Sequence, residues 1–259
     1  MDLSRFNSAS DLNDFYSSEP IWLWKKLIGE QLLYSFGDFS QTTDPQEALC
    51  NNTRAFYPYI PHHATVLDLG CGWGGPAQLL QTERNCQVTG VTISESQYHY
   101  CKNELGLTTI HGDIEKLTFS EQYDIVWMME SLEHIVDIAA LFQHLSTITN
   151  KLLIQTNCIA DHMDTPRWEF GNTMYMRKVS ELKQVLSLSG WKIEQVEDRR
   201  FHSIPTFQFW RNQLEVLKAA KHPIKGQLRV LEQHVVAFES NPIQWCRNHP
   251  LINLIAVQS

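Results

Sequence analysis

The stretch Val66-Leu67-Asp68-Leu69-Gly70-Cys71-Gly72-Trp73-Gly74-Gly75 decides the fold of this 259-residue chain. A short apolar run ends in an acidic residue, and glycines then follow at alternate positions. The pattern is typical of a buried strand that turns sharply into a helix, because a Cβ in such a turn blocks both the turn and a ligand lying on the backbone. A strand, a glycine-rich turn and a helix at the end of an open sheet form a nucleotide-type pocket. An ordinary tight turn is the alternative, and the rest of the sequence has to decide between the two.

Strands and helices alternate from residue 64 onward. The predicted strands are Val66–Leu69, Gln87–Ile93, Leu107–His111, Tyr123–Met129, Lys151–Thr156 and Trp191–Asp198, and helices begin near residues 76, 94, 138 and 179. This alternation predicts an α/β fold with a Rossmann-like, doubly wound and mostly parallel sheet. A last strand, Leu251–Val257, follows roughly 50 residues of helical pattern, which is longer than a loop in a compact domain.

The N-terminal residues form a predicted helical cap. Apolar residues between Ile21 and Leu32 recur at helical spacing, and Asp44-Pro45-Gln46-Glu47 starts a second helix with an N-cap carboxylate and a proline in the first turn. An aromatic loop, Tyr34-Ser35-Phe36-Gly37-Asp38-Phe39, lies between these helices. We therefore divide the chain into a cap with a covering loop (1–60), a core (61–199), a helical insertion (200–248) and a last core strand (249–259).

The composition is that of a globular protein with a sizeable core, 43% hydrophobic and 19% charged. The net charge of −8 argues against broad binding of nucleic acid or of an anionic membrane. The six cysteines lie far apart, so we expect reduced thiols in a cytoplasmic protein. The N-terminus is polar and no apolar run approaches ~20 residues, so neither a secretory signal nor a membrane span is expected.

Four further segments fall where a nucleoside ligand would need them. Thr92 and Ser94 end the second strand, where an adenosyl site usually has an acidic residue that accepts hydrogen bonds from the ribose. Gly112-Asp113-Ile114 follows the third strand, with a carboxylate for the adenine amino group and an apolar side chain for its ring. The segment Met129–His134 ends the fourth strand, and the Tyr34-Ser35 pair lies on the N-terminal loop.

In their order and spacing these motifs resemble the class I S-adenosylmethionine-dependent methyltransferases. The chain is most similar to the branch that holds γ-tocopherol methyltransferases, cyclopropane fatty acid synthases and plant alkaloid N-methyltransferases. The matching text is Val66–Gly75, Val88–Ser94 with Gln97, Tyr123–Trp127 followed by Glu130-x-x-Glu133-His134, and Tyr34-Ser35. The resemblance covers roughly residues 30–160, and 200–259 matches no family that we can name.

The resemblance implies S-adenosyl-L-methionine as the cofactor. The cofactor-binding residues it implies are Tyr34, Ser35, Asp68, Gly70, Gly72, Gly74, Thr92, Gln97, Asp113 and Ile114. The glycines would admit the methionine part of the cofactor to the backbone, and Asp68 would brace the turn. Thr92 and Gln97 would meet the ribose or adenine in a branch that lacks the usual acidic residue, with Glu95 as the acidic alternative.

Glu130, Glu133 and His134 are the candidate catalytic residues. Their spacing of i, i+3 and i+4 places them on one face if the segment is helical. Methyl transfer from a sulfonium is an in-line displacement, so the main requirements are alignment and exclusion of water. A base is needed when the acceptor must lose a proton, and His134 suits that role. Glu130 would orient the histidine or hold a cationic acceptor, whereas capping or solvent exposure is the alternative for Glu133 and His134.

The sequence therefore predicts methyl transfer to a small hydrophobic or aromatic molecule, with an oxygen, nitrogen or carbon acceptor, in specialised metabolism. Cyclopropane synthases of the branch also use a Glu and a His, in a bicarbonate site, so a cyclopropane-forming or C-methylating enzyme acting on a lipid-like chain is an alternative. A catalytically inactive cofactor-binding subunit is another. The expected partner is a small-molecule acceptor, with no nucleic acid and no membrane, and a homodimer is left open.

Two further groups of residues have weaker signals. Aromatic side chains that would line an acceptor pocket are Trp22, Trp24, Phe36, Phe39, Trp168, Tyr175, Phe207 and Trp210. The spacing of Asp161, His162 and Asp164 is too loose for a metal site, and no metal is expected.

Overall fold

The computed structural model describes residues 9–164, 168–169 and 174–259, and the sheet they form has eight strands. Its order is β3-β2-β1-β4-β5-β10-β9, and β8 pairs with β5 beside this path. The strands are β1 (Thr65–Leu69), β2 (Gln87–Thr92), β3 (Thr108–His111), β4 (Ile125–Met129), β5 (Lys151–Ile159), β8 (Arg177–Lys178), β9 (Trp191–Asp198) and β10 (Leu251–Gln258). Two short strands, β6 (Trp168–Glu169) and β7 (Met174–Tyr175), pair with each other apart from this sheet.

The strand directions are those of a doubly wound sheet. Strands β1 to β5 pair in parallel, whereas β10 runs antiparallel to both of its neighbours, β5 and β9. The order reverses between β1 and β4, the switch point at which such sheets bind ligands. The predicted Rossmann-like α/β fold is confirmed, and each predicted strand is present with small shifts at its ends.

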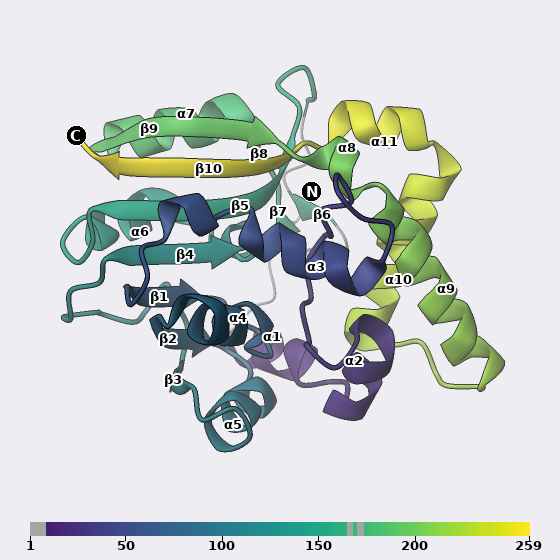
Figure 1. Cartoon of the computed structure of the whole chain (residues 1–259). Coiled ribbons are helices and arrows are strands. Elements are labelled where there is room, and N and C mark those ends of the chain that lie inside the picture. The colour runs from purple at the N-terminus through teal and green to yellow at the C-terminus, as the bar shows by residue number, and fades with distance from the viewer. Residues whose placement is uncertain (1–8, 165–167, 170–173) are drawn as a thin grey trace.

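Helices cover both faces of the sheet because successive strand residues point to opposite sides. On one face Leu67 and Met128 pack with α6 (Ile138–Leu145) and α7 (Val179–Leu188), and on the other Val66 and Trp127 pack with α4 (Gly75–Arg84). Figure 1 shows these layers. The helices are α1 (Ala9–Tyr16), α2 (Ile21–Ile28), α3 (Pro45–Arg54), η1 (Tyr57–Tyr59), α4 (Gly75–Arg84), α5 (Glu95–Asn103), η2 (Leu132–His134), α6 (Ile138–Leu145), α7 (Val179–Leu188), α8 (Arg200–Ser203), α9 (Pro205–Ala219), α10 (Gly226–Ser240) and α11 (Pro242–Asn248).

The N-terminal helices and the helices between β9 and β10 share a core of their own. Trp24 of α2, Trp210 of α9 and Leu231 of α10 are buried together, with Phe36 from the aromatic loop beside them. Figure 1 shows α2, α9 and α10 at the side toward which β4 points. Segments from the two ends of the chain therefore cover the carboxyl ends of the parallel strands.

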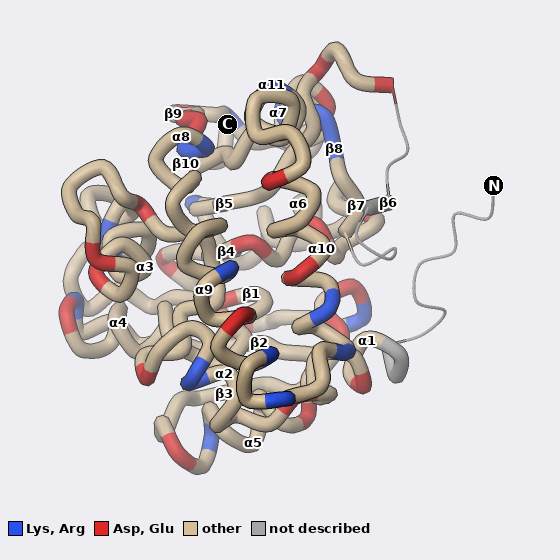
Figure 2. The backbone as a smooth tube through the Cα atoms, turned by 90° about the vertical axis from the view of Figure 1, so that its right-hand side faces the viewer, with Lys and Arg blue, Asp and Glu red and all other residues tan. Residues whose placement is uncertain are grey.

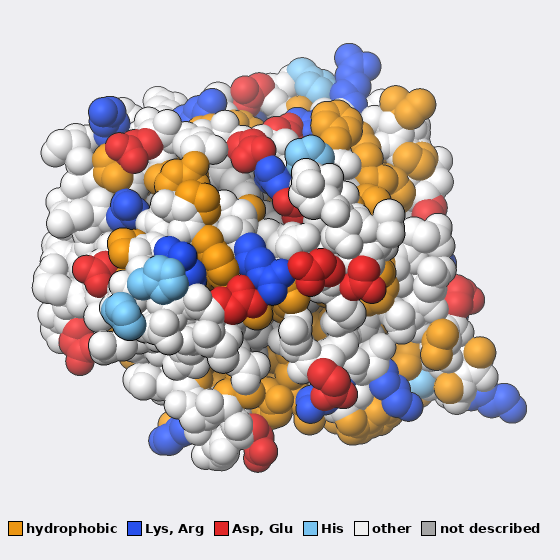
Figure 3. Space-filling model, viewed as in Figure 1, with side chains coloured by type: hydrophobic (Ala, Val, Ile, Leu, Met, Phe, Trp, Pro, Cys, Tyr) orange, Lys and Arg blue, Asp and Glu red, His pale blue; other side chains and the backbone are white. Residues whose placement is uncertain are grey.

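Acidic and basic side chains are interspersed on the faces that Figures 2 and 3 show. Arg54, for example, pairs with Glu47 and with Glu83, each at 2.7 Å. The faces in view thus carry no continuous basic surface, as expected for a net charge of −8. None of the helices in the described ranges has the length and apolar character needed to cross a membrane.

Candidate active site

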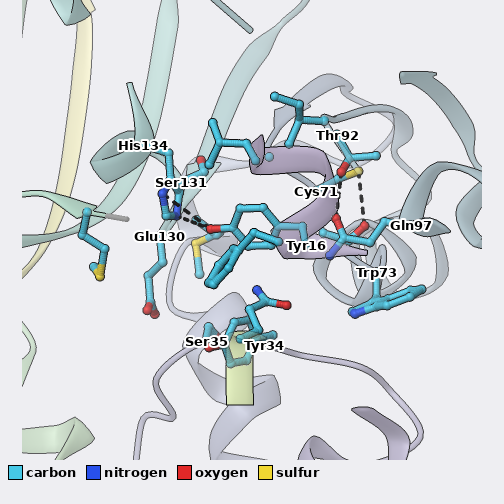
Figure 4. A pocket seen from close by; sticks show the side chains of 18 of the residues that line it. Tyr16, Tyr34, Ser35, Cys71, Trp73, Thr92, Gln97, Glu130, Ser131 and His134 are labelled. Carbon is cyan, nitrogen blue, oxygen red and sulfur yellow. Dashed lines mark hydrogen bonds between the residues drawn. The ribbon is translucent and has the colours of Figure 1, made fainter. Parts of the chain in front are cut away.

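A cavity lies at the carboxyl ends of β1, β2, β3 and β4, under the N-terminal helices and the helices between β9 and β10. Figure 4 shows side chains that line it. It brings together most of the sequence-predicted site residues. Those that line it are Tyr34, Ser35, Asp68, Gly70, Gly72, Thr92, Gln97, Asp113, Ile114, Glu130 and His134. Gly74 and Glu133 are not part of this lining.

The turn after β1 has the backbone shape that its glycines predict. The φ angles of Gly70, Gly72 and Gly74 are +91°, +54° and +82°, in the region that favours glycine. A Cβ on Gly70 would lie 2.4 Å from Cβ of Ser131, so this glycine lets the segment after β4 approach. A Cβ on Gly72 would meet no protein atom within 4 Å, which leaves its backbone open for a ligand.

Gly74 has a different position from its two neighbours. It is the N-cap of α4, and a Cβ there would lie 2.8 Å from Cδ1 of Leu105 and 3.0 Å from Sγ of Cys101. Its missing side chain allows α4 and α5 to pack closely. The structure thus gives Gly74 a packing contact rather than a place on the cavity wall.

Asp68 is buried at the end of β1. Burial raises the pKa of its carboxyl from 3.8 to about 7. Its Oδ2 has no hydrogen-bond partner in the part of the chain that the structure describes. A buried oxygen of this kind is costly unless it is paired, so Asp68 is suited to accept a hydrogen bond from a ligand, in addition to the predicted bracing of the turn.

Thr92 and Gln97 form a buried pair at the end of β2. The Thr92 hydroxyl donates to Oε1 of Gln97 at 2.7 Å and accepts from the backbone N–H of Ser94 at 3.2 Å. Ser94 caps α5, since its Oγ accepts from the backbone N–H of Gln97 at 3.3 Å. The cap and the pair hold the Gln97 side chain at the cavity, at the strand end where an adenosyl ribose is expected.

Asp113 and Ile114 line the next strand end. Oδ1 of Asp113 accepts from the backbone N–H of Glu115 at 3.1 Å, and Oδ2 lies 3.1 Å from Nζ of Lys116. Ile114 packs against the core on the α6 side of the sheet. Asp113 therefore shapes its own turn while it also faces the cavity.

The aromatic loop is fastened to the segment after β4. The backbone N–H of Phe36 donates to Oε1 of Glu130 at 2.8 Å. Tyr34 lies between Trp24 and Trp210, with ring centroids 4.8 and 6.4 Å apart, and its side chain is labelled with Ser35 in Figure 4. The hydrogen bond between Phe36 and Glu130 links the predicted cofactor-covering loop to a predicted catalytic residue.

The predicted shared helical face of the three catalytic candidates is not formed. Glu130 has a φ of +51° and precedes the short helix η2, which contains only residues 132–134. A left-handed residue at the strand end breaks the helical spacing, because residues before and after it no longer follow one helix axis. Glu130 and His134 still reach the same cavity through the turn.

Glu133 lies behind the cavity wall and is only 1% exposed. Its Oε1 accepts from the backbone N–H of Asn157 at 2.6 Å and from Nδ2 of the same residue at 2.8 Å. Nδ2 of Asn157 is also 3.5 Å from Oε2 of Glu130. Burial raises the pKa of Glu133 and raises that of Glu130 to about 8, with the proximity of Glu133 as a further cause for Glu130.

Sequence reasoning missed Tyr16 and Asn157, both of which line the cavity. The Tyr16 hydroxyl lies 2.7 Å from Nε2 of His134, and Figure 4 shows the two side chains pointing toward each other. Burial raises the pKa of Tyr16 well above 10, so the phenol keeps its proton. Asn157 could have been found as a polar residue near the carboxyl end of a buried strand, whereas no motif marks Tyr16.

Arg177 is a second residue without a sequence signal. It is 5% exposed, and its guanidinium donates to the carbonyls of Leu132 at 3.3 Å and Val136 at 2.9 Å, and also to that of Ile135. Burial lowers its pKa. Arg177 thus holds the backbone on both sides of His134.

Only part of the predicted aromatic set faces the cavity. Phe36 and Trp210 line it. Trp24 and Phe207 are buried in the core that the N-terminal helices share with the helices between β9 and β10, and Trp22 is 49% exposed. Phe39 and Tyr175 lie outside the lining, and the side chain of Trp168 is outside the described residues.

The loose acidic cluster after β5 has protein partners. Oδ1 of Asp161 accepts from the backbone N–H and the hydroxyl of Ser180, at 3.1 and 2.7 Å, and His162 lies 3.3 Å from Oδ1 of Asn248. Among the described residues no group of three or more His, Cys, Asp or Glu could hold a metal ion.

Comparison with known proteins finds a methyltransferase domain and methyltransferases among the proteins that this chain is similar to. Residues 66–151 match a family described as a methyltransferase domain. The chain is 33% identical over 129 residues to (S)-tetrahydroprotoberberine N-methyltransferase of Eschscholzia californica, covering 47% of this chain and 37% of that protein. It is 26% identical over 202 residues to cyclopropane mycolic acid synthase 2 of Mycobacterium bovis, covering 63% and 65%. The matched part is less than two thirds of the length of each relative.

A solved structure extends the likeness in fold to almost the whole chain. Coclaurine N-methyltransferase bound to N-methylheliamine and S-adenosylhomocysteine superposes with a TM-score of 0.77 at 20% identity, covering 96% of this chain and 82% of that one. The caps as well as the core are included in this coverage. Taken with the strand order and the glycine turn, these matches support a class I S-adenosylmethionine-dependent methyltransferase of the branch that its motifs indicate.

Proposed function

We propose that the protein transfers a methyl group from S-adenosylmethionine to a small hydrophobic or aromatic molecule. The observation that carries this proposal is that one cavity is lined both by an open glycine turn, at Gly72, and by the polar side chains of Glu130 and His134. Cofactor-binding and proton-handling groups therefore face the same space.

The residues on the β1 to β3 side fit an adenosyl cofactor. The open backbone at Gly72 leaves room for its methionine part, and the unpaired Oδ2 of Asp68 is suited to its ammonium group. Thr92 and Gln97 offer hydroxyl and amide groups to the ribose, and Asp113 offers a carboxylate to the adenine. When bound, the cofactor would supply an electrophilic methyl group on its sulfonium.

The remaining residues of the cavity would position the acceptor. Tyr34, Phe36 and Trp210 give an aromatic wall that excludes water, which the displacement requires. His134, held by Tyr16, would take the proton of an acceptor hydroxyl or amine. The carboxyl of Glu130 would orient the same hydroxyl or amine of the acceptor. Asn157, which Glu133 holds, is in turn beside Glu130 and keeps it in place.

The second candidate is cyclopropane formation or C-methylation on a lipid-like chain. The apolar side chains of Leu12, Ile135 and Met174 in the cavity favour it, as does the likeness to a cyclopropane mycolic acid synthase. A catalytically inactive subunit is disfavoured, because the hydrogen-bonded pair of Tyr16 and His134 lines the same cavity as Glu130 and the glycine turn. We further propose a cytoplasmic enzyme of specialised metabolism without a nucleic-acid or membrane partner.

Methyl-labelled S-adenosylmethionine tests the proposal directly. We expect label transfer to one or more members of a panel of phenols and aromatic amines, loss of transfer in His134→Ala, and unchanged transfer in the matched surface variant His99→Ala. Vesicles of a monounsaturated phospholipid, with and without bicarbonate, form the competing arm. Label that enters only the lipid would favour the second candidate, and failure to bind S-adenosylhomocysteine would contradict both.

A further inference from the structure

Three buried carboxamides form a cluster that joins α3 to the sheet. Asn52 of α3, Gln155 of β5 and Asn253 of β10 are at most 4% exposed, and none of the three is part of the cavity lining. Asn52 and Gln155 form a reciprocal pair: Nδ2 of Asn52 donates to Oε1 of Gln155 at 2.8 Å, and Nε2 of Gln155 donates to Oδ1 of Asn52 at 2.8 Å. Nε2 of Gln155 also donates to Oδ1 of Asn253, at 2.7 Å.

The same face of the sheet is apolar next to this cluster. Leu153 and Ile255 occupy the adjacent positions of that face on β5 and β10, and both belong to the core on the α4 side. Apolar side chains tolerate small shifts of their neighbours. A paired polar network fixes one arrangement instead, because a shift leaves a buried polar group without a partner.

The carboxamide cluster is connected to the aromatic loop and to Glu130. Nδ2 of Asn52 donates to Oγ of Ser35 at 3.4 Å, and the backbone carbonyl of Gln155 accepts from the backbone N–H of Glu130 at 2.8 Å. The loop is itself joined to Glu130 by the bond from the Phe36 N–H. These contacts close a ring, which runs through Ser35, Phe36, Glu130, Gln155 and Asn52.

The ring fixes the aromatic loop relative to the turn after β4. Ser35 and Glu130 both line the cavity, one from each side of the ring. The left-handed φ of +51° at Glu130 is a strained conformation, which persists only where its surroundings hold it. In the described part of the chain, the side chain of Asn253 bonds to Gln155 and to no other member of the ring. Asn253 thus belongs to the cluster but not to the ring.

We propose that Asn52 and Gln155 are positioning residues, which hold the cofactor-covering loop and Glu130 in the arrangement needed to bind the cofactor. Because both lie behind the cavity wall, they act through Ser35 and Glu130 rather than on the cofactor itself. This inference rests on the proposed methyl transfer and adds to its machinery two residues outside the cavity.

Asn52→Leu and Asn253→Leu are the matched variants. Each removes a carboxamide that bonds to Gln155, so both should lower the melting temperature, but only Asn52→Leu opens the ring. We expect calorimetry to show affinity for S-adenosylhomocysteine about tenfold weaker in Asn52→Leu, and within about twofold of wild type in Asn253→Leu. In a Ser35→Ala background, Asn52→Leu should weaken binding by less than about twofold, since the ring is already open.

Hydrogen exchange in the absence of ligand gives an independent readout. Amides of residues 34–37 should exchange severalfold faster in Asn52→Leu than in Asn253→Leu, because the ring holds this loop. The triple variant Asn52→Leu/Gln155→Met/Asn253→Leu serves if Asn52→Leu does not fold. It leaves none of the three carboxamides to be unpaired, and it should show the same weaker affinity and faster exchange.

The outcomes separate this inference from the proposed function. Equal affinity and equal exchange in Asn52→Leu and Asn253→Leu would overturn the positioning role, because a loss of stability alone affects both variants. A triple variant that binds and exchanges as the wild type does would overturn it as well. If wild-type protein does not bind S-adenosylhomocysteine, the proposed function fails, whereas exchange at residues 34–37 still decides whether the ring holds the loop.

Discussion

The hydroxyl of Tyr16 lies 2.7 Å from Nε2 of His134, and the two rings meet edge-on with centroids 5.5 Å apart. Tyr16 ends the first helix described by the structure, and His134 ends η2, 118 residues later. The pair joins the N-terminal cap to the core at the cavity. It gives His134 a partner that a motif search around β4 does not reveal.

Replacing Tyr16 with phenylalanine removes the hydroxyl and keeps the ring. We expect methyl transfer to slow about tenfold, which corresponds to the ~1.4 kcal/mol of one hydrogen bond, with affinity for S-adenosylhomocysteine within about twofold of wild type. The pH–rate profile should shift as well, because the hydrogen bond between Tyr16 and His134 is lost. Tyr98→Phe, on the outer side of α5, is the control. An unchanged rate and profile in Tyr16→Phe would show that the pair has no part in the reaction.

Gly72→Ala should block the cofactor without unfolding the protein. The new Cβ meets no protein atom, so the expected cost to stability is the left-handed backbone, about 1 kcal/mol. Gly106→Ala is a close control, since Gly106 has a φ of +64°, is exposed, and would also meet no atom within 4 Å. Calorimetry should show at least a tenfold loss of S-adenosylhomocysteine affinity in Gly72→Ala alone. Equal losses in both variants would point to strain instead.

Glu130→Gln should flatten the pH dependence of stability. The pKa of Glu130 is raised from 4.5 to about 8, so between these values the folded state holds a proton that the unfolded state has released. The free energy of unfolding then falls as pH rises, by up to ~1.4 kcal/mol per pH unit from this group, and levels off above pH 8. Glutamine is neutral and keeps the carbonyl that accepts from Phe36, so it removes this contribution.

Thermal unfolding of both proteins between pH 5 and pH 9 provides the measurement. Asp68 and Glu133 also have raised pKa values and act in the same direction, so the difference between Glu130→Gln and wild type is the quantity of interest. Glu194→Gln, on the exposed side of β9, should leave the wild-type slope unchanged. A Glu130→Gln variant with the wild-type slope would mean that Glu130 is ionised in the folded protein.

Arg177→Met should loosen the segment that carries His134. The variant loses the hydrogen bonds to the carbonyls of Leu132, Ile135 and Val136, and we expect the free energy of unfolding to fall by about 2–3 kcal/mol. Denaturant titration checks the stability, and hydrogen exchange over residues 131–136 checks the location. Arg247→Met, at an exposed position of α11, should have little effect. Wild-type exchange in that segment would exclude Arg177 as its anchor.

Much of the fold was predictable because its signals are local. Val66 to Leu69 is an apolar run followed by glycines, and Asp44 caps α3 through a bond from the backbone N–H of Glu47, as the sequence predicts. Alternation of strands and helices then leaves few topologies. The place of Gly70, Gly72 and Thr92 at the cavity could be predicted in the same way, because a ligand near the backbone requires small or hydroxyl-bearing residues at strand ends.

The sequence by itself determined the doubly wound sheet, the glycine turn and the place of the cavity, because strand ends of a parallel sheet meet at one edge. Only the tertiary structure decided that Glu130 adopts a left-handed backbone, that Glu133 lies behind the wall, and that Gly74 serves packing. It also brought Tyr16 and Arg177 to the site, and Asn52 to Gln155 behind it. These contacts join segments more than 40 residues apart through packed helices, and the physical reason is that close packing, unlike periodicity, depends on all the elements at once.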